Sequence, residues 1–463
     1  MAKKDTEFQD SAQDRDDLAR VYHAIMARNP EHDFEPTLDR VTQVLDLLGN
    51  PQHAFRSVHI TGTNGKTSTA RMVESLVAEH GLRTGRFTSP HLASVTERIT
   101  IDGEPVSARR FVEVYEDVIP YIEMVDASSQ AVGGPALSFF EVLVVMAYAA
   151  FADAPVDVAV VEVGMGGVWD ATNVITPQVS IITPISLDHT QWLGDTYADI
   201  AAEKAGIIKE GRPVIVSAQP PSAHDVIVHR AHEVGAQVIA DGVDMGVASR
   251  LPAVGGQLVS LRTPAATYTD VFLPLFGSYQ ADNAVAALVA TEVVMAGGGA
   301  LHGDIVEAGF AKVTSPGRLE VVRSSPTIVL DAAHNPGGIE ALTQALDESF
   351  DFTRLVGVVS CLADKDAETL FALLEPHLAE VVVTSIDSPR AADIEDLADI
   401  ARDIFGEDRV AVEPVLDAAI DAAATRAESQ DTVGSGIGTG VLIVGSVLLV
   451  AHARSLLLRE RRR

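Results

Sequence analysis

The chain of 463 residues contains a single cysteine, Cys361, which excludes an internal disulfide and a zinc site built from several thiolates. This scarcity of cysteine fits a reducing compartment, so we expect a cytoplasmic protein. Positive charge is also scarce, since 34 Lys and Arg residues stand against 65 Asp and Glu residues, for a formal net charge of −31. A chain this acidic has no general basic surface for nucleic acid, and we expect no such partner.

Long hydrophobic runs are missing as well. The uncharged stretch Thr432–His452 is strongly apolar only over Val441–Val450, which is short for a span of about 20 apolar residues. We therefore expect no membrane partner, and predict a glycine loop, a buried strand at Val441–Val444 and a closing helix. At the N-terminus, acidic residues follow two lysines with no apolar segment behind them, so residues 1–16 are predicted to be a disordered acidic tail rather than a secretory signal.

Between these ends, short β-branched runs alternate with longer amphipathic stretches. We predict strands at Ser57–Thr61, Val156–Val163, Val179–Thr183, Pro213–Val216, Thr327–Asp331, Leu355–Val359, Val381–Thr384 and Val441–Val444. We predict helices at Thr67–Glu79, Ala108–Met124, Phe139–Phe151, Ile200–Ile208, Asp282–Met295, Gly338–Ser349, Ala367–Leu374 and Leu416–Arg426. Most strands lack period-two alternation, which indicates an α/β fold with parallel sheets covered by helices on both faces.

The domain organisation follows from composition. Glycines at 297–299 and the sequence Ser315-Pro316-Gly317 suggest a boundary near residue 310, which gives a larger first domain at residues 17–310 and a smaller second one at 311–463. The polar, β-like stretch Asp241–Thr269 is predicted to be a hairpin excursion of the first domain.

The sharpest local signal is the segment Ile60–Ser68, which follows a predicted strand and opens a predicted helix. Its glycines let backbone N–H groups turn toward a phosphate, the helix N-terminus adds positive potential, and Lys66 can reach the outer phosphates. The Thr67 hydroxyl would hold Mg²⁺. The match is incomplete, because Thr61 stands where such loops begin with glycine; an ordinary strand-to-helix turn is the alternative.

Three further groups of polar residues follow predicted strands. Glu162 ends a buried strand, where a carboxylate needs Mg²⁺ or a paired base to offset its burial. His189 follows another strand, although a lone histidine is more often part of the core, and Lys204 lies in a small-residue helix where a salt bridge or snorkelling would explain it. Asp331 and His334 follow a strand of the second domain and are expected to face a crevice.

Taken together, these motifs resemble the folylpolyglutamate synthase and dihydrofolate synthase family, relatives of the Mur ligases of cell-wall synthesis. The resemblance runs from about Leu38 to Arg454. The motifs that carry it, in family order, are Thr61–Lys66, Phe87–His91, Ser138–Glu141, Glu162–Asn173, Asp188-His189, Glu203–Gly206, Pro316–Glu320, Asp331–Pro336, Ser388–Ala391 and, more weakly, Val441–Ser446.

The resemblance implies a P-loop-type, mostly parallel sheet domain followed by a smaller Rossmann-like α/β domain. It also implies ATP-driven amide formation, in which a carboxylate takes the γ-phosphate and glutamate's amine then displaces phosphate. The substrates would be ATP, L-glutamate and dihydropteroate or a reduced folate. The cofactors would be two Mg²⁺ ions, with a monovalent cation such as K⁺ as a further candidate.

The family pattern also assigns roles to residues. The expected ATP-binding residues are Thr63, Asn64, Gly65, Lys66, Thr67, Asn283, Arg318 and Asp331. The expected metal ligands are Ser89, Glu162 and His189, and the expected pterin pocket consists of Ser138, Phe139, Phe140 and Asp170; plain helix core is the alternative for the two phenylalanines. The expected catalytic residues are Lys66, Lys204, His189 and His334, with Lys204 carbamylated by CO₂ to N6-carboxylysine.

One departure from the family pattern is Tyr279, which stands where the family usually has histidine before Gln280. Two other functions are weighed against the folate ligase. A Mur-type amino-acid ligase would share the phosphate loop and the modified lysine, but Phe140, Asp170 and the Ser89-Pro90-His91 loop favour folate. Against a nucleotide-binding regulatory protein that has lost catalysis stand the intact residues Glu162, His189, Lys204 and Arg318. Since one chain supplies the whole predicted site, we expect a monomer.

Overall fold

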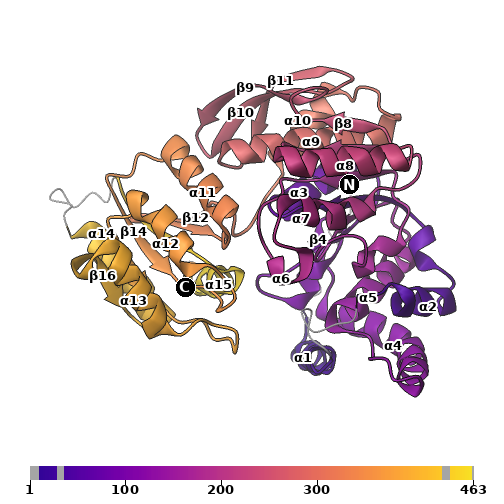
Figure 1. Cartoon of the computed structure of the whole chain (residues 1–463), viewed down its shortest axis with the longest axis horizontal. Helices are drawn as coiled ribbons and strands as arrows, with labels where there is room; N and C mark the ends of the chain where they lie inside the picture. Colours follow the sequence, from indigo (N-terminus) through magenta and orange to yellow (C-terminus); the bar gives the residue numbers. More distant parts are fainter. Residues whose placement is uncertain (1–9, 29–35, 430–437, 461–463) are drawn as a thin grey trace.

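Two sheets with their covering helices lie side by side in the computed structural model of the chain (Figure 1), which describes residues 10–28, 36–429 and 438–460. The larger sheet has eight strands in the order β4-β3-β2-β5-β1-β6-β7-β8. Their bounds are β1 Arg56–Thr61, β2 Thr84–Phe87, β3 Ile99–Ile101, β4 Glu104–Pro105, β5 Val158–Glu162, β6 Val179–Ile182, β7 Val214–Val216 and β8 Val238–Ala240. All strands from β2 to β8 in that order are parallel, whereas β3 and β4 pair antiparallel at one edge.

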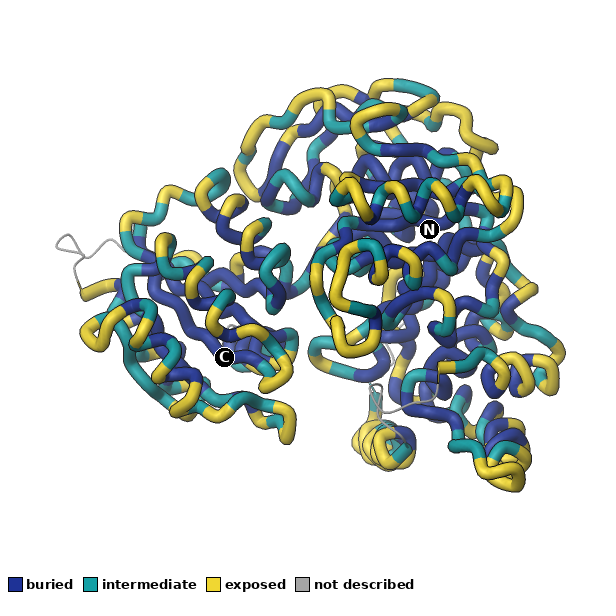
Figure 2. Tube along the Cα trace, in the orientation of Figure 1, coloured by how far each residue is buried: buried dark blue, intermediate teal, exposed yellow. Residues whose placement is uncertain are grey.

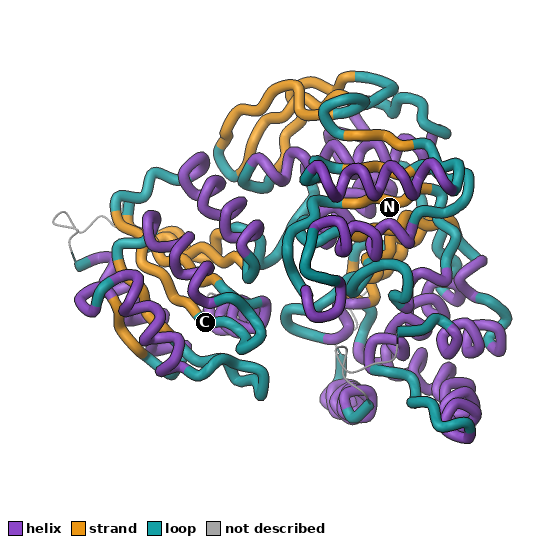
Figure 3. Tube along the Cα trace, in the orientation of Figure 1, coloured by secondary structure: helices purple, strands orange, loops and turns teal. Residues whose placement is uncertain are grey.

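Helices pack around the larger sheet (Figure 3). They are α1 Ala12–Met26, α2 Asp39–Leu47, α3 Lys66–Glu79, α4 Ala108–Ala131, α5 Phe139–Asp153, α6 Thr190–Leu193, α7 Tyr197–Lys204, α8 Pro221–Glu233, α9 Ser278–Ala296 and α10 Gly303–Ala311. The predicted hairpin excursion is a three-stranded antiparallel sheet, so it has one strand more than a hairpin. Its strands are β9 Gly246–Ala253, β10 Gly256–Arg262 and β11 Thr267–Leu273.

The central strands lack an alternation of apolar and polar residues because both faces of the sheet are buried. On β5, Val160 joins the core formed with α3 and α9, while Val161 joins the core formed with α4 and α5. Each fully buried valine contributes about 1.5–3 kcal/mol relative to exposure. Figure 2 shows this central layer buried beneath partly exposed helices. The predicted α/β class is therefore confirmed.

The smaller sheet has six strands in the order β12-β13-β17-β14-β15-β16, parallel except for β12. Its strands are β12 Glu320–Ser324, β13 Thr327–Asp331, β14 Arg354–Val359, β15 Glu380–Val383, β16 Val410–Val412 and β17 Thr439–Val444. Its helices are α11 Pro336–Ser349, α12 Ala367–Leu374, α13 Ile394–Phe405, α14 Leu416–Glu428 and α15 Val447–Glu460. Because the sheets change between α10 and β12, we propose the domain boundary there, close to residue 310.

The apolar segment near the C-terminus is a strand and a helix, as predicted. Strand β17 is fully buried between β13 and β14, and α15 follows it. No helix in the described part of the chain is both long and apolar enough to cross a membrane. Most of the predicted glycine loop, residues 430–437, lies outside the described residues.

The prediction of a disordered tail over residues 1–16 is wrong for residues 12–16, which belong to α1. Ser11 caps this helix, since its hydroxyl accepts from the Asp14 N–H while the Asp14 carboxylate accepts from the Ser11 N–H. Val21 and Ile25 are then buried against the core that contains α4 and α5. The acidic residues of this segment form the solvated face of the helix. Residues 1–9 lie outside the described residues.

Candidate active site

Four adjacent strands of the larger sheet end at one edge. In the order β2-β5-β1-β6, their carboxyl ends lead into Thr88-Ser89, Glu162, the loop Gly62–Gly65 and the segment Ser186–His189. Open parallel sheets bind ligands at this edge, because the carboxyl ends of all parallel strands and the N-termini of the following helices meet there. The sheet thus gathers groups that are a hundred residues apart in the sequence.

The loop between β1 and α3 makes a close turn that its backbone hydrogen bonds hold in place. Gly65 has φ +89°, and a Cβ there would lie 2.6 Å from Asn283 Oδ1, so only glycine fits this position. The Thr63 and Asn64 N–H groups both donate to the Pro184 carbonyl, which fixes the loop to the neighbouring β6. Lys66 begins α3 and bends back, so that Nζ donates to the carbonyls of Gly62 (3.1 Å) and Thr63 (3.0 Å).

Glu162 and Thr67 form the centre of the predicted metal site. The Thr67 hydroxyl lies 2.9 and 3.0 Å from the two Glu162 carboxylate oxygens, and the Ser89 N–H lies 3.4 Å from Oε2. Burial raises the pKa of Glu162, and the nearby Lys66 ammonium opposes that rise. The described residues contain no group of three His, Cys, Asp or Glu side chains able to hold a metal. One carboxylate with two hydroxyl residues suits a Mg²⁺ ion that takes its remaining ligands from phosphates and water.

Lys204 lies at the end of α7 and points under the phosphate loop. Its Nζ donates to the Gly62 carbonyl at 2.8 Å, the same carbonyl that Lys66 uses. Burial, with the charge of Lys66 adding to it, lowers the pKa of Lys204 to about 7. Within the described chain Lys204 forms no ion pair, so neither a salt bridge nor a snorkelling side chain accounts for it.

The two sheets meet at the phosphate loop. The side-chain amides of Asn64 and Asn335 exchange two hydrogen bonds of 3.2 Å. Asp188, whose side chain is largely buried, also contacts residues of the second domain. Its carboxylate accepts from Lys365 Nζ at 2.7 Å and from the Asn335 amide at 3.1 Å, and it lies 3.6 Å from His334 Nε2. These contacts hold the end of β6 against the loops after β13 and β14.

His189, next to Asp188, adopts a left-handed conformation with φ +51°, and its side chain is 41% exposed. Because its side chain is this exposed, His189 is not a core histidine. Lys365 is a residue that sequence reasoning missed, although its position between Asp364 and Asp366, after a predicted strand, was a usable signal.

The remaining predicted ATP residues approach the same place from the second sheet. Asp331 ends β13 and accepts from the N–H groups of Leu319 and Ala333, each at 2.8 Å. Arg318 donates to the Gly317 carbonyl at 3.1 Å. A pocket between the two parts of the chain, here called the interdomain pocket, is lined by Thr67 and Pro90 on one side and by Arg318 on the other.

Asn283 lies beneath the loop rather than in the interdomain pocket. It donates to Gln280 (3.2 Å), Gln280 donates to the Ser68 hydroxyl (3.3 Å), and Ser68 shares a hydrogen bond with Ser315 (2.9 Å). This polar chain connects α9, α3 and the segment before β12 beneath the phosphate loop.

The residues of the predicted pterin pocket contact neighbouring side chains of the same domain. Ser138 caps α5 in a capping box with Glu141, and Phe139 is buried beneath the Arg98 guanidinium, 5.0 Å from the ring centre. Phe140 is half-buried and packs on Phe87, with ring centres 5.7 Å apart.

Asp170 is buried and already fully used as an acceptor. Its Oδ2 accepts from the N–H groups of Gly164 and Met165, both at 3.0 Å, and its Oδ1 accepts from the Thr172 N–H at 2.9 Å and from the Thr172 hydroxyl. Its place in a pterin pocket stays a prediction, and the structure shows a loop-closing role for the same carboxylate.

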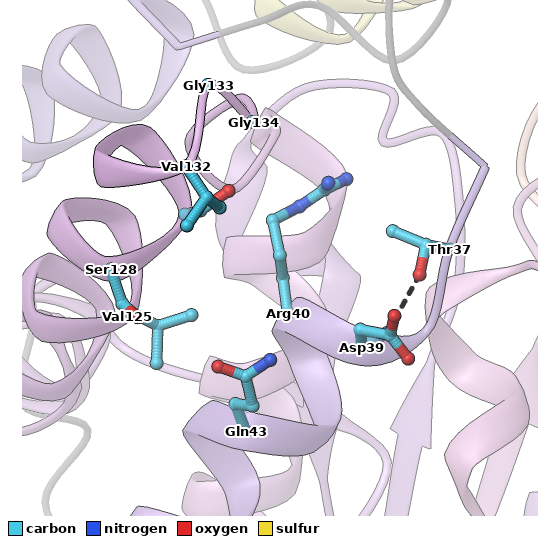
Figure 4. A pocket seen from close by; sticks show the side chains of 10 residues that line it. Thr37, Asp39, Arg40, Gln43, Val125, Ser128, Val132, Gly133 and Gly134 are labelled. Carbon is cyan, nitrogen blue, oxygen red and sulfur yellow. Dashed lines mark hydrogen bonds between the residues drawn. The ribbon is translucent and has the colours of Figure 1, made fainter.

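Figure 4 shows a second pocket of the molecule. Residues of α2 and of the end of α4, among them Asp39, Gln43 and Ser128, line it. None of the predicted site residues contributes to it, so the interdomain pocket is the better candidate for chemistry.

Comparisons with known proteins show the family of the chain. Residues 133–291 match the Mur ligase middle domain, and residues 317–435 match the Mur ligase glutamate ligase domain. The dihydrofolate synthase/folylpolyglutamate synthase of Mycobacterium tuberculosis is 49% identical over 459 residues, covering 96% of this chain and 94% of that protein. The chain belongs to the dihydrofolate synthase/folylpolyglutamate synthase family.

Solved structures place the fold in the same family. The M. tuberculosis folylpolyglutamate synthase complexed with ADP and AMPPCP has a TM-score of 0.91 and 48% identity, covering 96% of this chain and 99% of that one. An Escherichia coli relative in complex with DHPP and ADP has a TM-score of 0.82 and 28% identity, covering 96% and 98%. The protein is therefore an ATP-dependent ligase of folate metabolism. The alternative of a Mur-type amino-acid ligase acting on a cell-wall precursor is not supported.

Proposed function

We propose that this ligase joins L-glutamate to 7,8-dihydropteroate and also extends the glutamate chain of reduced folates. The family membership supports the reaction class, and the observation that carries the proposal is the interdomain pocket, where the phosphate-loop helix faces Arg318 of the second sheet. A reaction that transfers a phosphoryl group before forming an amide needs such a closed, charged site more than it needs covalent help.

In the first step, a substrate carboxylate oxygen attacks the γ-phosphorus of ATP, the bond to the β,γ-bridging oxygen breaks, and ADP leaves. Lys66 Nζ donates to two loop carbonyls, and we propose that it turns outward to the β- and γ-phosphates, which are stronger acceptors. Thr63 and Asn64, whose N–H groups already donate to the Pro184 carbonyl, are proposed to line the phosphate site. The Gly65 N–H and the N-terminus of α3 would add partial positive charge.

In the second step, the amine of L-glutamate attacks the acyl carbon, phosphate leaves, and an amide forms. Asp188, Lys365 and Asn335 keep the second domain against the phosphate loop while this happens, which excludes water from the acyl phosphate. His334 and Arg318 are proposed to face the transferred phosphoryl group, and Asp331 and Asn283 to position the nucleoside.

Ser89, Glu162 and Thr67 are proposed to hold one Mg²⁺, and His189 a second. When bound, these ions neutralise phosphate charge during transfer. A monovalent ion such as K⁺ stays a candidate with no residue assigned. Lys204 is proposed to be carbamylated: an amine with a pKa of about 7 is partly neutral at physiological pH and can attack CO₂. The product is an anion beside Lys66, which relieves the repulsion between two buried ammonium groups.

Ser138, Phe139, Phe140 and Asp170 are proposed to form the pterin pocket. Because a single chain supplies both walls of the site, we propose a monomer; the cytoplasmic location rests on the single cysteine. The decisive test is glutamate incorporation by the full-length chain with ATP, scored side by side with dihydropteroate and with a reduced folate. Incorporation into both supports the proposal, while incorporation into neither, alongside normal ATP binding, contradicts it.

A further inference from the structure

Arg71 lies on α3 one helical turn after Thr67, and residues four apart lie on the same helix face. Both side chains line the interdomain pocket, together with Pro90 and Glu97 of the neighbouring loop and Arg318 and Val447 of the second sheet's side. Arg71 was not singled out by any motif, because an arginine inside a helix carries no signal of its own.

Each carboxylate near Arg71 has a partner other than Arg71, although Glu74 Oε1 is buried without a hydrogen bond. Glu74 pairs with the buried Arg86 at 2.9 Å, and Glu162 accepts from Thr67. Glu97 accepts from three successive backbone N–H groups, those of residues 92, 93 and 94, at 2.8–3.1 Å. Within the described ranges, the Arg71 guanidinium itself makes no hydrogen bond and no ion pair.

Leaving a guanidinium in this state is costly, because a mostly buried charge without a partner forfeits its hydration. Burial, with the charge of Arg86 adding to it, lowers the pKa of Arg71 to about 10, so the side chain is still a cation at neutral pH. Its open side is the interdomain pocket, and across that pocket stands a second guanidinium, Arg318. Two guanidinium groups on facing walls of one pocket repel each other until an anion lies between them.

We propose that Arg71 and Arg318 form an anion clamp, in which one arm from each domain binds a phosphate oxygen of the nucleotide. This inference rests on the proposed function and extends it to a residue outside the phosphate loop. Phosphate is favoured over a substrate carboxylate because Thr67, which follows Lys66 at the start of α3, shares the pocket wall with Arg71. A guanidinium fork matches phosphate oxygens, and binding from both sides would favour the closed arrangement of the domains.

The test is calorimetric binding of MgAMPPCP and MgADP to full-length Arg71→Gln and Arg71→Lys. Loss of one charge-assisted contact predicts about tenfold weaker MgAMPPCP binding to Arg71→Gln, with partial recovery in Arg71→Lys. An equal loss with MgADP indicates contact with the α- or β-phosphate, and a loss with MgAMPPCP alone indicates the γ-phosphate. Unchanged MgAMPPCP affinity would overturn the clamp.

Steady-state kinetics separate phosphate from carboxylate. The proposal expects a raised KM for ATP in Arg71→Gln. A raised KM for the folate or for glutamate, with ATP unaffected, would refute the phosphate assignment. Arg109→Gln, which removes a charge from a 74% exposed side chain of α4, should match the wild type.

Thermal unfolding separates a ligand role from a structural one. Because Arg71 lacks protein partners, Arg71→Gln should be at least as stable as the wild type; a clearly lowered Tm would indicate a structural role and count against the clamp. The binding measurements need no turnover, so they stand apart from the glutamate-incorporation assay on which the proposed function depends.

Discussion

The nucleotide end of the site and its predicted pterin end satisfy their charged groups in different ways. At the nucleotide end, the hydrogen bonds that Lys66, Lys204 and Arg318 donate within the described residues go to backbone carbonyls. At the pterin end, Asp170 accepts from four donors, and Glu141 combines a helix cap with an ion pair to Arg40 at 3.2 Å.

This difference has a physical consequence. Neutral carbonyls are weak partners for cations, so an incoming anion can replace them at little cost. A carboxylate with four donors has no free lone pair and holds its loop in one shape. Substitutions at the nucleotide end should therefore change catalysis with little change in stability, while substitutions at the pterin end should change both.

The largest effect is expected for Lys66→Ala. Removing the ammonium should lower ATP-dependent phosphate release, in the presence of dihydropteroate and glutamate, by at least about 100-fold, because it stabilises charge on the transferred phosphoryl group. The Tm should stay within a few degrees of the wild type. Lys312→Ala, which removes a 64% exposed lysine, is the matched control. Full activity in Lys66→Ala would refute the role of the loop.

Lys204→Ala should lose nearly as much activity and regain part of it with added small carboxylates. The pKa is lowered from 10.5 to about 7, so the amine is neutral above pH 7 and becomes protonated below it. Only the neutral amine reacts with CO₂, and carbamate should therefore be abundant at pH 8 and scarce at pH 6. Carbon-13 NMR with labelled bicarbonate measures this directly; equal signals at both pH values would argue against carbamylation.

Asp170→Asn tests the other end. Replacing one carboxylate oxygen with an amide leaves backbone N–H groups without an acceptor, and should lower the free energy of unfolding by about 1–3 kcal/mol. Denaturant unfolding gives the stability and kinetics give the KM for the pteroyl substrate, while MgADP affinity should not move. If Asp170→Asn had the same free energy of unfolding as the wild type, the proposed difference between the nucleotide end and the pterin end would be wrong.

The smallest effect is expected for Tyr279→Phe. The ring lies against Gly277, where a Cβ would approach it to 2.6 Å, and burial raises the pKa of its hydroxyl. Packing depends on the ring rather than on the hydroxyl, so the KM for ATP should change by no more than about twofold. A tenfold change would show that this departure from the family pattern contacts the nucleotide through its oxygen.

Much of the fold was predictable because buried parallel strands leave a strong signal. Strand β17 was recognised from Val441–Val444, and α3, α5 and α11 were placed within a residue or two. Short or edge strands such as β3 and β8 were missed, since three residues carry too little pattern. Helix α1 was mistaken for a tail because its acidic face outweighed Val21 and Ile25, whose burial depends on distant helices.

The site residues came from motifs and from family resemblance, and their roles stay predictions. What the motifs did not contain was pairing across the domains: Asp188 with Lys365, Asn64 with Asn335, and Arg71 opposite Arg318. Each of these pairs joins residues more than a hundred positions apart.

The sequence by itself determined the local chemistry of this protein: a glycine where φ must be positive, a lysine at a helix start, and carboxylates at strand ends. Only the tertiary structure decided which charges are satisfied and which remain available. That balance depends on the distances between side chains of different elements, and a linear pattern carries no information about those distances until the sheets bring the elements together.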